Sequence, residues 1–455
     1  MTTAAAPRLV KCVVWDIDNT LLDGVYLESG DAPPAANPAM AGALSDLASR
    51  GILHAIASKN PPQAAAHAAA MTGAYFAAVE CDWGPKSGAL ARIAAELAIG
   101  TDALAFVDDD PYERAEVGAE LPEVLVLAPD EVTGAAGWPE FGAAAVTGEA
   151  RRRGEMYAAR RHRQAAERAF GGSREEFLAS AGTEVTVTAA TMADVPRLHE
   201  LAARTRQFNS AGRAVPETEL AALITAPDTD VATVTLRDAF GDDGIVGACV
   251  TGHDPDGTWT VRLLMMSCRA MGRGVIGALL AWVTRSAARA GAREVAVRCV
   301  LTERNVPLRL ALTGAGFRAG REGGEGPGAV FRRGTGAPLP ALPAWVRAPG
   351  EPERAGGGAA GRAGADPAPA GPDGLVIGEL RQILARITGR DELAGLPAGA
   401  PLFGEAVALD SLTGTLLLRE VQRRFGVDVA GIDLNLDALA TLGTLAAFIA
   451  GQGGS

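Results

Sequence analysis

The sequence of 455 residues predicts a multidomain α/β protein in three parts. The first part alternates apolar, strand-like runs with helical stretches, which is typical of a parallel, doubly wound sheet of Rossmann type. The middle part combines strands of period-two character with helices, so we expect an α+β domain. The last part has only helical apolar spacing and predicts a small all-α domain of four helices.

Changes in composition and hydrophobic pattern indicate where these parts begin and end. We expect a first domain over residues 8–147, a charged helical connector over 148–182, a second domain over 183–335, a linker over 336–373 and a third domain over 374–452. The linker is rich in Pro, Gly and Ala and lacks apolar bulk, so it cannot form a core. We therefore predict that it is a flexible tether.

The chain is acidic, with a formal net charge of -12. This charge argues against nucleic-acid binding, because no basic field offsets the repulsion from phosphates. The five cysteines are scattered and form no Cys-x-x-Cys pair, which disfavours a zinc site and indicates reduced thiols. No apolar run is long enough to span a membrane, and the N-terminus has no apolar signal-peptide core. We expect a cytoplasmic protein that binds neither membranes nor nucleic acid.

The connector carries a basic cluster, Arg151–Arg153, followed by Arg160 and Arg161. We interpret this cluster most simply as the solvated face of a helix that joins two domains. Attraction of an acidic partner protein is the alternative interpretation.

Polar side chains follow three apolar runs of the first domain at the point where each run ends. Asp16 and Asp18 follow the first run, Ser58 the second, and Asp108 with Asp109 the third. The carboxyl ends of parallel strands meet at one edge of a sheet, so we expect these side chains to lie close together. Paired aspartates often only cap turns, but the recurrence of polar clusters after successive strands favours a site for phosphate and metal.

The residue types at this edge are those that phosphoryl transfer needs. One carboxylate can attack a phosphorus atom, and a second, two positions along the chain, can protonate the leaving oxygen. Distal carboxylates can share Mg²⁺ with the nucleophile, because Mg²⁺ prefers hard oxygen ligands. A hydroxyl and the ammonium of Lys86, which lies in a turn at the start of a helix, can hold the transferring phosphoryl group.

Four strings carry a resemblance to the haloacid dehalogenase (HAD) superfamily of phosphotransferases, and more closely to its FkbH-like subfamily. They are Asp16–Leu21, Ser58–Asn60, Trp83–Ser87 and Asp108–Arg114. The resemblance implies that Asp16 is the nucleophile and Asp18 the acid/base, and that Ser58 and Lys86 belong to the second and third motifs. It implies a fourth motif at Asp108 and Asp109. The metal ligands expected on this basis are Asp16, Asp18, Asp108 and Asp109.

The FkbH-like resemblance also implies an activity. Members of that subfamily take a three-carbon glyceryl unit from bisphosphoglycerate, remove phosphate and load the unit on an acyl carrier protein. Two positions depart from the family pattern: Ala57 stands where the family often has Cys, and Asp110 where it usually has Asn. Because position 57 is alanine, no cysteine is present there to perform a role that the family could assign to it.

The second domain contains a glycine loop, Arg269-x-x-Gly272-x-Gly274, between a predicted strand and a predicted helix. Glycines there let backbone amides approach a pyrophosphate at the helix N-terminus. Together with Ala315–Phe317 further along the chain, the loop resembles the acyl-CoA N-acyltransferase (GNAT) fold. This resemblance makes CoA a candidate cofactor. Cys268 lies beside the loop, where cations and a helix N-terminus favour a thiolate that could carry a thioester. The alternative is a small residue that fills a strand–helix corner.

The third domain contains Leu409-Asp410-Ser411-Leu412 at the start of a predicted helix. Either polar residue could simply be an N-cap. In a helical module of this size behind a flexible linker, however, the string resembles the attachment signature of acyl and peptidyl carrier proteins. The resemblance implies that Ser411 carries 4′-phosphopantetheine through a phosphodiester. The helix that follows is more basic than is usual in carriers.

The sequence therefore suggests an enzyme that loads a carrier in polyketide or related biosynthesis. Its expected partners are a phosphoacyl donor, a phosphopantetheinyl transferase and downstream carrier-dependent enzymes. Two alternatives stay open. The chain could be a phosphatase or a CoA-dependent acyltransferase that acts on a different acyl unit, or a catalytically degenerate scaffold that docks the carrier.

Overall fold

The computed structural model describes residues 9–30, 32–142, 147–302, 304–321, 328–338, 345–347, 372–403, 407, 409, 411–433 and 436–452. The chain divides into two compact units, Met1–Ala165 and Ala166–Ser455. Most of the predicted linker, and Asp410, lie outside the described residues. Among the described helices, none is both long and apolar enough to cross a membrane.

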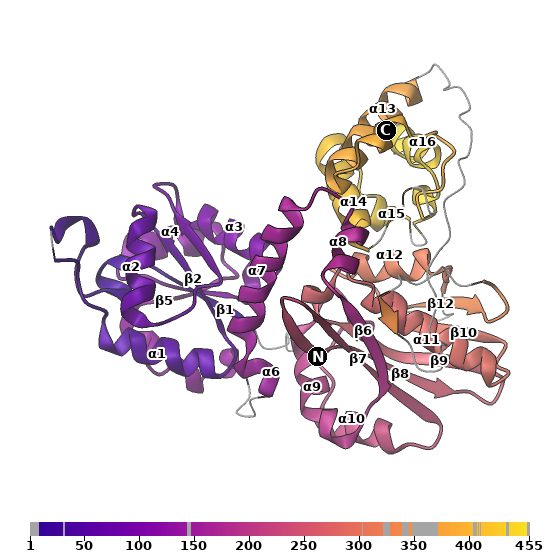
Figure 1. The fold of residues 1–455 in the computed structure, drawn as a ribbon, viewed down its shortest axis with the longest axis horizontal. Helices are drawn as coiled ribbons and strands as arrows, with labels where there is room; N and C mark the ends of the chain where they lie inside the picture. The colour runs from indigo at the N-terminus through magenta and orange to yellow at the C-terminus, as the bar shows by residue number, and fades with distance from the viewer. Residues whose placement is uncertain are drawn as a thin grey trace. The chain divides into compact units, whose positions relative to one another are not determined.

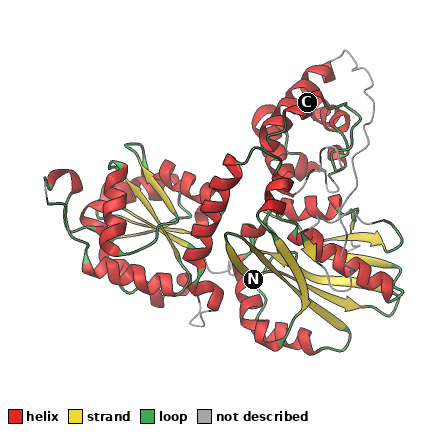
Figure 2. Cartoon of the chain, viewed as in Figure 1, coloured by secondary structure: helices red, strands yellow, loops and turns green. Residues whose placement is uncertain are grey.

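The first unit is built on a five-stranded sheet of order β3-β2-β1-β4-β5, with helices on both faces (Figures 1 and 2). Every neighbouring pair of strands is parallel. The strands are β1 Cys12–Trp15, β2 Leu53–Ser58, β3 Ala78–Cys81, β4 Leu104–Val107 and β5 Leu125–Leu127. β1 is central and buried at every residue, which explains its unbroken apolar sequence.

Two apolar layers cover this sheet. Helices α1 and α2 pack on one face and helices α3 and α4 on the other. The helices of the first unit are α1 Pro38–Ser49, α2 Pro62–Thr72, α3 Lys86–Leu97, α4 Pro111–Glu120, α5 Pro129–Val132 and α6 Gly148–Arg151, and α7 Arg153–Ala169 continues beyond the unit. Strand–helix alternation and parallel pairing confirm the predicted doubly wound sheet.

The connector differs from its prediction at one arginine. Arg153 is only 6% exposed, and its guanidinium donates to the carbonyl of Gly51 at 2.8 Å. The prediction of a solvated basic face is therefore wrong at Arg153. Arg151 and Arg152 are exposed, as predicted. The sequence could not distinguish Arg153 from its neighbours, because the arginine of a basic run that becomes buried is the one that the fold places beside a carbonyl acceptor.

The second unit contains an eight-stranded mixed sheet of order β11-β12-β10-β9-β8-β7-β6-β13 (Figure 1). The strands are β6 Glu184–Ala189, β7 Thr229–Asp238, β8 Gly241–His253, β9 Thr258–Met266, β10 Glu294–Val300, β11 Arg318–Arg321, β12 Gly328–Gly334 and β13 Val346–Arg347. Strands β6 to β9 form an antiparallel meander, whereas β10 is parallel to β9.

Helices cover both faces of this sheet. The helices of this part are α8 Arg174–Ser180, α9 Val195–Arg204, α10 Glu217–Thr225, α11 Val275–Arg289 and α12 Val306–Gly314. Helices α11 and α12 share one apolar cluster with the sheet, and α9 and α10 share another. Val346, which we expected in the tether, is only 6% exposed and belongs to the first of these clusters. The tether prediction therefore fails at β13, which pairs in parallel with β6.

The C-terminal part of the second unit is helical, as predicted. Its described residues form α13 Pro372–Thr388, α14 Ser411–Phe425, α15 Val429–Ile432 and α16 Leu442–Gln452. Leucines dominate their shared apolar core, including Leu380, Leu417 and Leu445, each fully buried. The predicted fold class, a multidomain α/β protein with a parallel sheet, an α+β domain and a small all-α domain, is confirmed.

Candidate active site

The parallel sheet of the first unit brings the predicted phosphoryl-transfer residues to one edge. Trp15, the last residue of β1, pairs with Ile56 of β2 and with Val107 of β4. Asp16 directly follows β1, Asp108 directly follows β4, and Ser58 is the last residue of β2. Because the three strands are neighbours in register, these side chains leave the sheet side by side.

A single irregular turn follows Asp16 and sets the direction of Asp18. Residues Ile17–Leu21 form one π-helical turn, in which Asn19 has a left-handed φ of 50°. The carboxylate of Asp18 accepts hydrogen bonds from the backbone N–H of Tyr26 and from the amide of Asn60, both at 2.9 Å. Asp18 is thus held beside Asp16 by partners of its own.

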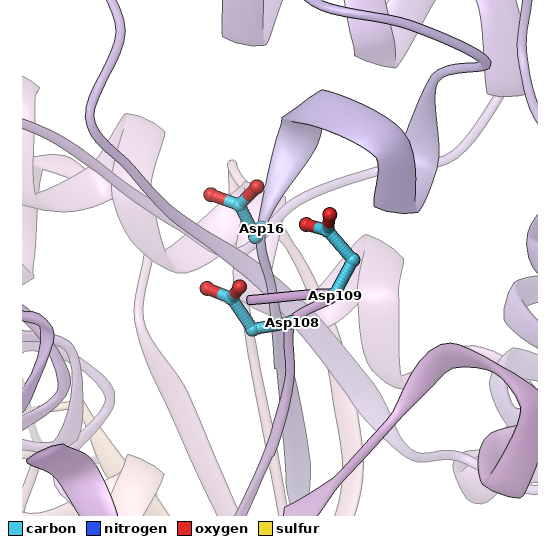
Figure 3. Close-up of side chains that lie close together, drawn as sticks. All are labelled: Asp16, Asp108 and Asp109. Carbon is cyan, nitrogen blue, oxygen red and sulfur yellow. The ribbon is translucent and has the colours of Figure 1, made fainter. Parts of the chain in front are cut away.

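Three carboxylates form a candidate metal site. Asp16, Asp108 and Asp109 each offer an oxygen, and these oxygens all lie within 4.8 Å of one another (Figure 3). Asp16 and Asp108 are buried, whereas Asp109 is exposed. The carboxylate of Asp18, the fourth predicted ligand, lies outside this group, and its oxygens are bonded to Tyr26 and Asn60.

The donor set fits Mg²⁺ in chemistry and in charge. All ligand atoms are carboxylate oxygens, the hard donors that Mg²⁺ prefers. Three carboxylates and the neighbouring ammonium of Lys86 leave two negative charges in all, which one divalent cation would balance. Residues Asp16, Asp108 and Asp109 could therefore hold the ion.

Lys86 is the cation of the site. Its Nζ donates to Asp16 Oδ1 at 2.5 Å, to the carbonyl of Ala57 at 2.7 Å and to Asp108 Oδ2 at 3.1 Å. The side chain is only 4% exposed, and Lys86 is the first residue of α3. The ammonium is therefore fixed by three acceptors and bridges two of the candidate ligands.

Burial and mutual repulsion shift the pKa values of these groups. Burial raises the pKa of Asp16, and Lys86 opposes this shift. Burial, and then the charge of Asp16, raise the pKa of Asp108 to about 6, although Lys86 opposes both. Burial alone would lower the pKa of Lys86, but the two carboxylates more than offset it and raise that pKa. Clustered perturbed groups of this kind are typical of functional sites.

Two contributors to the site were not among the predicted site residues. Asn60 is 2% exposed, and its amide donates to Asp18 and to the Ser58 hydroxyl, so it couples two motifs. Arg114 donates to the carbonyls of Asp108 and Asp109 at 2.6 and 2.8 Å and fixes the backbone that presents them. Both residues lie in the strings that carry the family resemblance, which was the signal available for them.

Two half-buried thiols, Cys81 and the predicted relay Cys268, lie in different settings. Cys81 is half-buried and pairs in register with Ser58, at the edge of the first sheet where the candidate site lies. Burial, and then the charge of Asp16, raise the pKa of the Cys81 thiol, which disfavours the reactive thiolate. Cys268 belongs to the second unit, where it follows β9 after Ser267 and is half-buried. Its thioester role stays a prediction.

The glycine loop of the second unit has the backbone that a phosphate nest requires. Gly272 and Gly274 have left-handed φ values of 73° and 82°, and Gly274 directly precedes α11. Arg273 turns inward, where its guanidinium pairs with Asp238 and Asp243, each at 2.7 Å. Arg269, the first residue of the motif, donates to the Ser267 hydroxyl at 3.4 Å.

Ser411, the predicted attachment residue, is the first residue of α14. The placement agrees with the predicted helix start, and the role of Ser411 stays a prediction.

Comparisons with known proteins bear on separate parts of the chain. Residues 378–449 match the family model described as a phosphopantetheine attachment site. No curated protein matches the chain.

Solved structures resemble individual parts. The N-terminal part of a Bacteroides fragilis protein, which contains a phosphatase domain and was solved with Mg, is 26% identical, with 30% of this chain and 39% of that chain covered and a TM-score of 0.25. This chain thus spans about two fifths of that solved chain. A GNAT-family acetyltransferase from Desulfovibrio desulfuricans is 19% identical, with 33% and 99% covered and a TM-score of 0.27. The PaiA N-acetyltransferase of Thermoplasma acidophilum, in complex with coenzyme A, is 13% identical, with the same coverage and TM-score.

With TM-scores this low, the structural similarities assign no activity. A family model matches the C-terminal domain, whereas the two sheets are described by their strand order alone. The chain thus has, in order, a parallel sheet with an acidic edge, a mixed sheet with a glycine loop, and a domain of the phosphopantetheine-attachment family.

Proposed function

We propose that this chain is an enzyme that removes phosphate from a phosphorylated acyl donor and loads the acyl unit on its own carrier domain. The unit proposed is the three-carbon glyceryl group of bisphosphoglycerate. One observation carries the proposal: a buried Asp16–Lys86–Asp108 cluster, with the carboxylate of Asp109 beside it, occurs in a chain that has a phosphopantetheine-attachment domain. A phosphoryl-transfer site and a thiol-bearing arm on one chain favour coupled reactions.

The phosphoryl step uses the edge of the first sheet. The Asp16 carboxylate attacks the phosphorus atom, and the bond between phosphorus and the leaving alkoxide oxygen breaks. Asp18 delivers a proton to that oxygen, and Asn60 keeps its carboxyl in place. Water then hydrolyses the aspartyl phosphate. Ser58 donates to an oxygen of the transferring group, and the ammonium of Lys86 supplies fixed positive charge next to Asp16. Mg²⁺ held by Asp16, Asp108 and Asp109 would add positive charge where negative charge accumulates.

The acyl step joins the glyceryl unit to the carrier. The thiol of the arm on Ser411 attacks the acyl carbon of the donor's acyl phosphate, the bond from that carbon to the phosphate oxygen breaks, and the thiol proton leaves with phosphate. The thioester formed replaces one activated acyl bond by another, so no further energy source is required. Cys268 is the proposed relay if the unit first rests on the protein itself.

The test is a mass measurement on the holo protein. We expect that bisphosphoglycerate and Mg²⁺ add one glyceryl unit to the Ser411 peptide, and that Asp16→Asn lowers the rate about 10³-fold or more. Asp46→Asn, which changes an exposed carboxylate of α1, serves as the control and should load normally. A Ser411 peptide that gains no glyceryl mass refutes the proposed donor, and unchanged loading by Asp16→Asn refutes the role of the site.

A second candidate is a Mg²⁺-dependent phosphatase that acts on a different carrier-bound acyl unit. The cluster of carboxylates and Lys86 supports phosphoryl chemistry without selecting the acyl group. A panel of phosphoacyl donors in the same assay separates the two candidates, because only the preferred unit adds its mass to the Ser411 peptide.

A further inference from the structure

The mixed sheet opens between two of its parallel strands. Strands β9 and β10 pair only over residues 258–261 and 294–297. β9 continues to Met266 and stays paired with β8, whereas β10 continues to Val300 and stays paired with β12. The two strands therefore diverge toward the glycine loop, and their facing backbone groups need other partners there.

A segment of the same chain supplies those partners. The backbone N–H of Ser210 donates to the Leu264 carbonyl, and the Leu264 N–H donates to the Ser210 hydroxyl, both at 2.9 Å. The Met266 N–H donates to the Phe208 carbonyl at 2.9 Å. On the other side of the opening, the Val300 N–H donates to the Ser210 carbonyl at 2.8 Å. Residues 208–210 are thus bonded to both diverging strands.

The segment is fixed as firmly as the strands beside it. Phe208 is fully buried in the main apolar cluster, and Asn209 and Ser210 are each 1% exposed. The Asn209 side-chain amide donates to the carbonyl of Arg213 at 2.9 Å, and its oxygen accepts from the Ala211 N–H at 3.0 Å. These bonds close a rigid loop around Asn209 and hold residues 208–210 in the opening.

The position of the segment bears on CoA. A pyrophosphate in the nest at Gly272 and Gly274 would lie directly beyond the end of β9, so an attached pantetheine would run back along β9. Pantetheine contains amides, and an extended amide chain adds to a sheet only where backbone N–H and C=O groups are unpaired. The N–H and C=O of Leu264 and the N–H of Met266 are already bonded to residues 208–210. The glycine loop keeps its left-handed glycines at the start of α11, but the slot for the arm is filled.

We propose that residues 208–210 are a built-in plug that closes the pantetheine slot of the mixed sheet. The second unit consequently accepts no acyl group from soluble acyl-CoA, and any affinity of this domain for CoA comes from its phosphates alone. This inference goes beyond the proposed function and does not depend on it, because neither of its measurements involves glyceryl loading.

The binding test compares acetyl-CoA with 3′-phosphoadenosine 5′-diphosphate, which presents all the phosphates of CoA without pantetheine, on the full-length protein. We expect both to bind with dissociation constants that agree within about threefold, or not to bind at all. Acetyl-CoA that binds more than about threefold more tightly than 3′-phosphoadenosine 5′-diphosphate overturns the proposal, because the difference would measure contacts with the arm.

Hydrogen exchange tests the plug itself. In the free protein, we expect the amides of Leu264 and Met266 to be protected, and acetyl-CoA to leave exchange in residues 205–212 unchanged. Ser210→Ala, which removes the acceptor of the Leu264 N–H, should speed exchange of that amide about tenfold. Ser180→Ala removes a hydroxyl that donates to the Phe177 carbonyl in α8 and is the matched control. Equal exchange of Leu264 in the two variants, or new exchange in residues 205–212 with acetyl-CoA, overturns the proposal.

Discussion

At the scale of single residues, the acidic edge of the first sheet is organised by one ammonium group. Lys86 binds Asp16 and Asp108 at once and is almost completely buried. Two buried carboxylates this close would otherwise repel each other and take up protons. Lys86 therefore opposes the rise in the pKa of Asp16 that burial causes and favours the anionic form that a nucleophile needs, and the same contacts make its removal costly.

Replacement of Lys86 should destabilise the first unit more than replacement of a neighbouring lysine. In EDTA, we expect Lys86→Met to lower the free energy of unfolding by about 3–5 kcal/mol, because it leaves buried charge without a partner. Lys59→Met, which breaks a half-exposed pair with Glu113, should cost no more than about 1 kcal/mol. Chemical denaturation measures both. Mg²⁺ should restore part of the loss in the Lys86 variant, and equal losses in the two variants would contradict this account.

Asp108 should make Mg²⁺ binding depend on pH. Its pKa is raised to about 6, so below that pH the folded, metal-free protein holds a proton that the ion must displace. The apparent affinity for Mg²⁺ should therefore fall as pH falls, by up to about tenfold per unit below pH 6. Titration calorimetry at pH 5 and pH 7.5, in buffers of different ionisation enthalpy, also counts the protons released. An affinity that is constant over this range would contradict the prediction.

Motif residues at strand ends could be predicted because a parallel sheet brings strand ends together whatever the details of its loops. Asp16, Ser58 and Asp108 meet for this reason, and Lys86 reaches Asp16 and Asp108 from the start of α3. The pairing of Asp18 with Asn60 could not be predicted in the same way. It depends on the π-helical turn after Asp16, whose left-handed residue is Asn19 rather than glycine.

At the scale of elements, long apolar runs gave reliable strands, and short or polar ones did not. β1 and β2 are buried at every residue, so their hydrophobic runs were unambiguous. β13 has two residues inside a segment rich in Pro, Gly and Ala, and it is a strand only because β6 offers an edge. Pairing of this kind is set by tertiary context, which a local pattern does not contain.

The junction between α1 and β2 depends on one glycine. Gly51 has a φ of 74°, and a Cβ there would lie 2.6 Å from the carbonyl oxygen of Ala150. Gly51→Ala should destabilise the first unit by about 2–4 kcal/mol, from left-handed strain together with overpacking. Hydrogen exchange of β1 and β2 amides measures the loss.

Gly73 is the matched control for Gly51. It has a φ of 66° at the end of α2, but a Cβ there would meet nothing within 4 Å. Gly73→Ala should therefore cost only the strain, about 1–2 kcal/mol. Equal losses at the two glycines would show that contact with Ala150 contributes nothing.

At the scale of the whole molecule, the order of the parts suggests that loading occurs within one chain. Linked sites meet at millimolar effective concentration when the linker can span them. A mixture of Asp16→Asn chains and Ser411→Ala chains contains one intact site and one intact carrier, but on different molecules. At micromolar protein, we expect this mixture to load about 10²–10³-fold more slowly than the unmodified chain.

Intact mass measured over time gives both rates. Ser411→Ala alone should load nothing, and Asp16→Asn alone should load at no more than about 10⁻³ of the unmodified rate; both serve as controls. A mixture that loads as fast as the unmodified chain would show that delivery occurs between molecules.

The segment at residues 208–210 also has a consequence for fidelity. A thiol arm tethered beside a working acyl-CoA site would be exposed to whichever acyl-CoA is abundant, and acetyl groups would compete with the intended unit. Because Leu264 and Met266 are already bonded to that segment, the pantetheine of a competing acyl-CoA cannot pair with β9 there. Exclusion of a wrong donor in this way requires no tighter binding of the right one. Errors in charging the carrier should therefore reflect selection at the acidic edge of the first sheet alone, independent of the cell's supply of acyl-CoA.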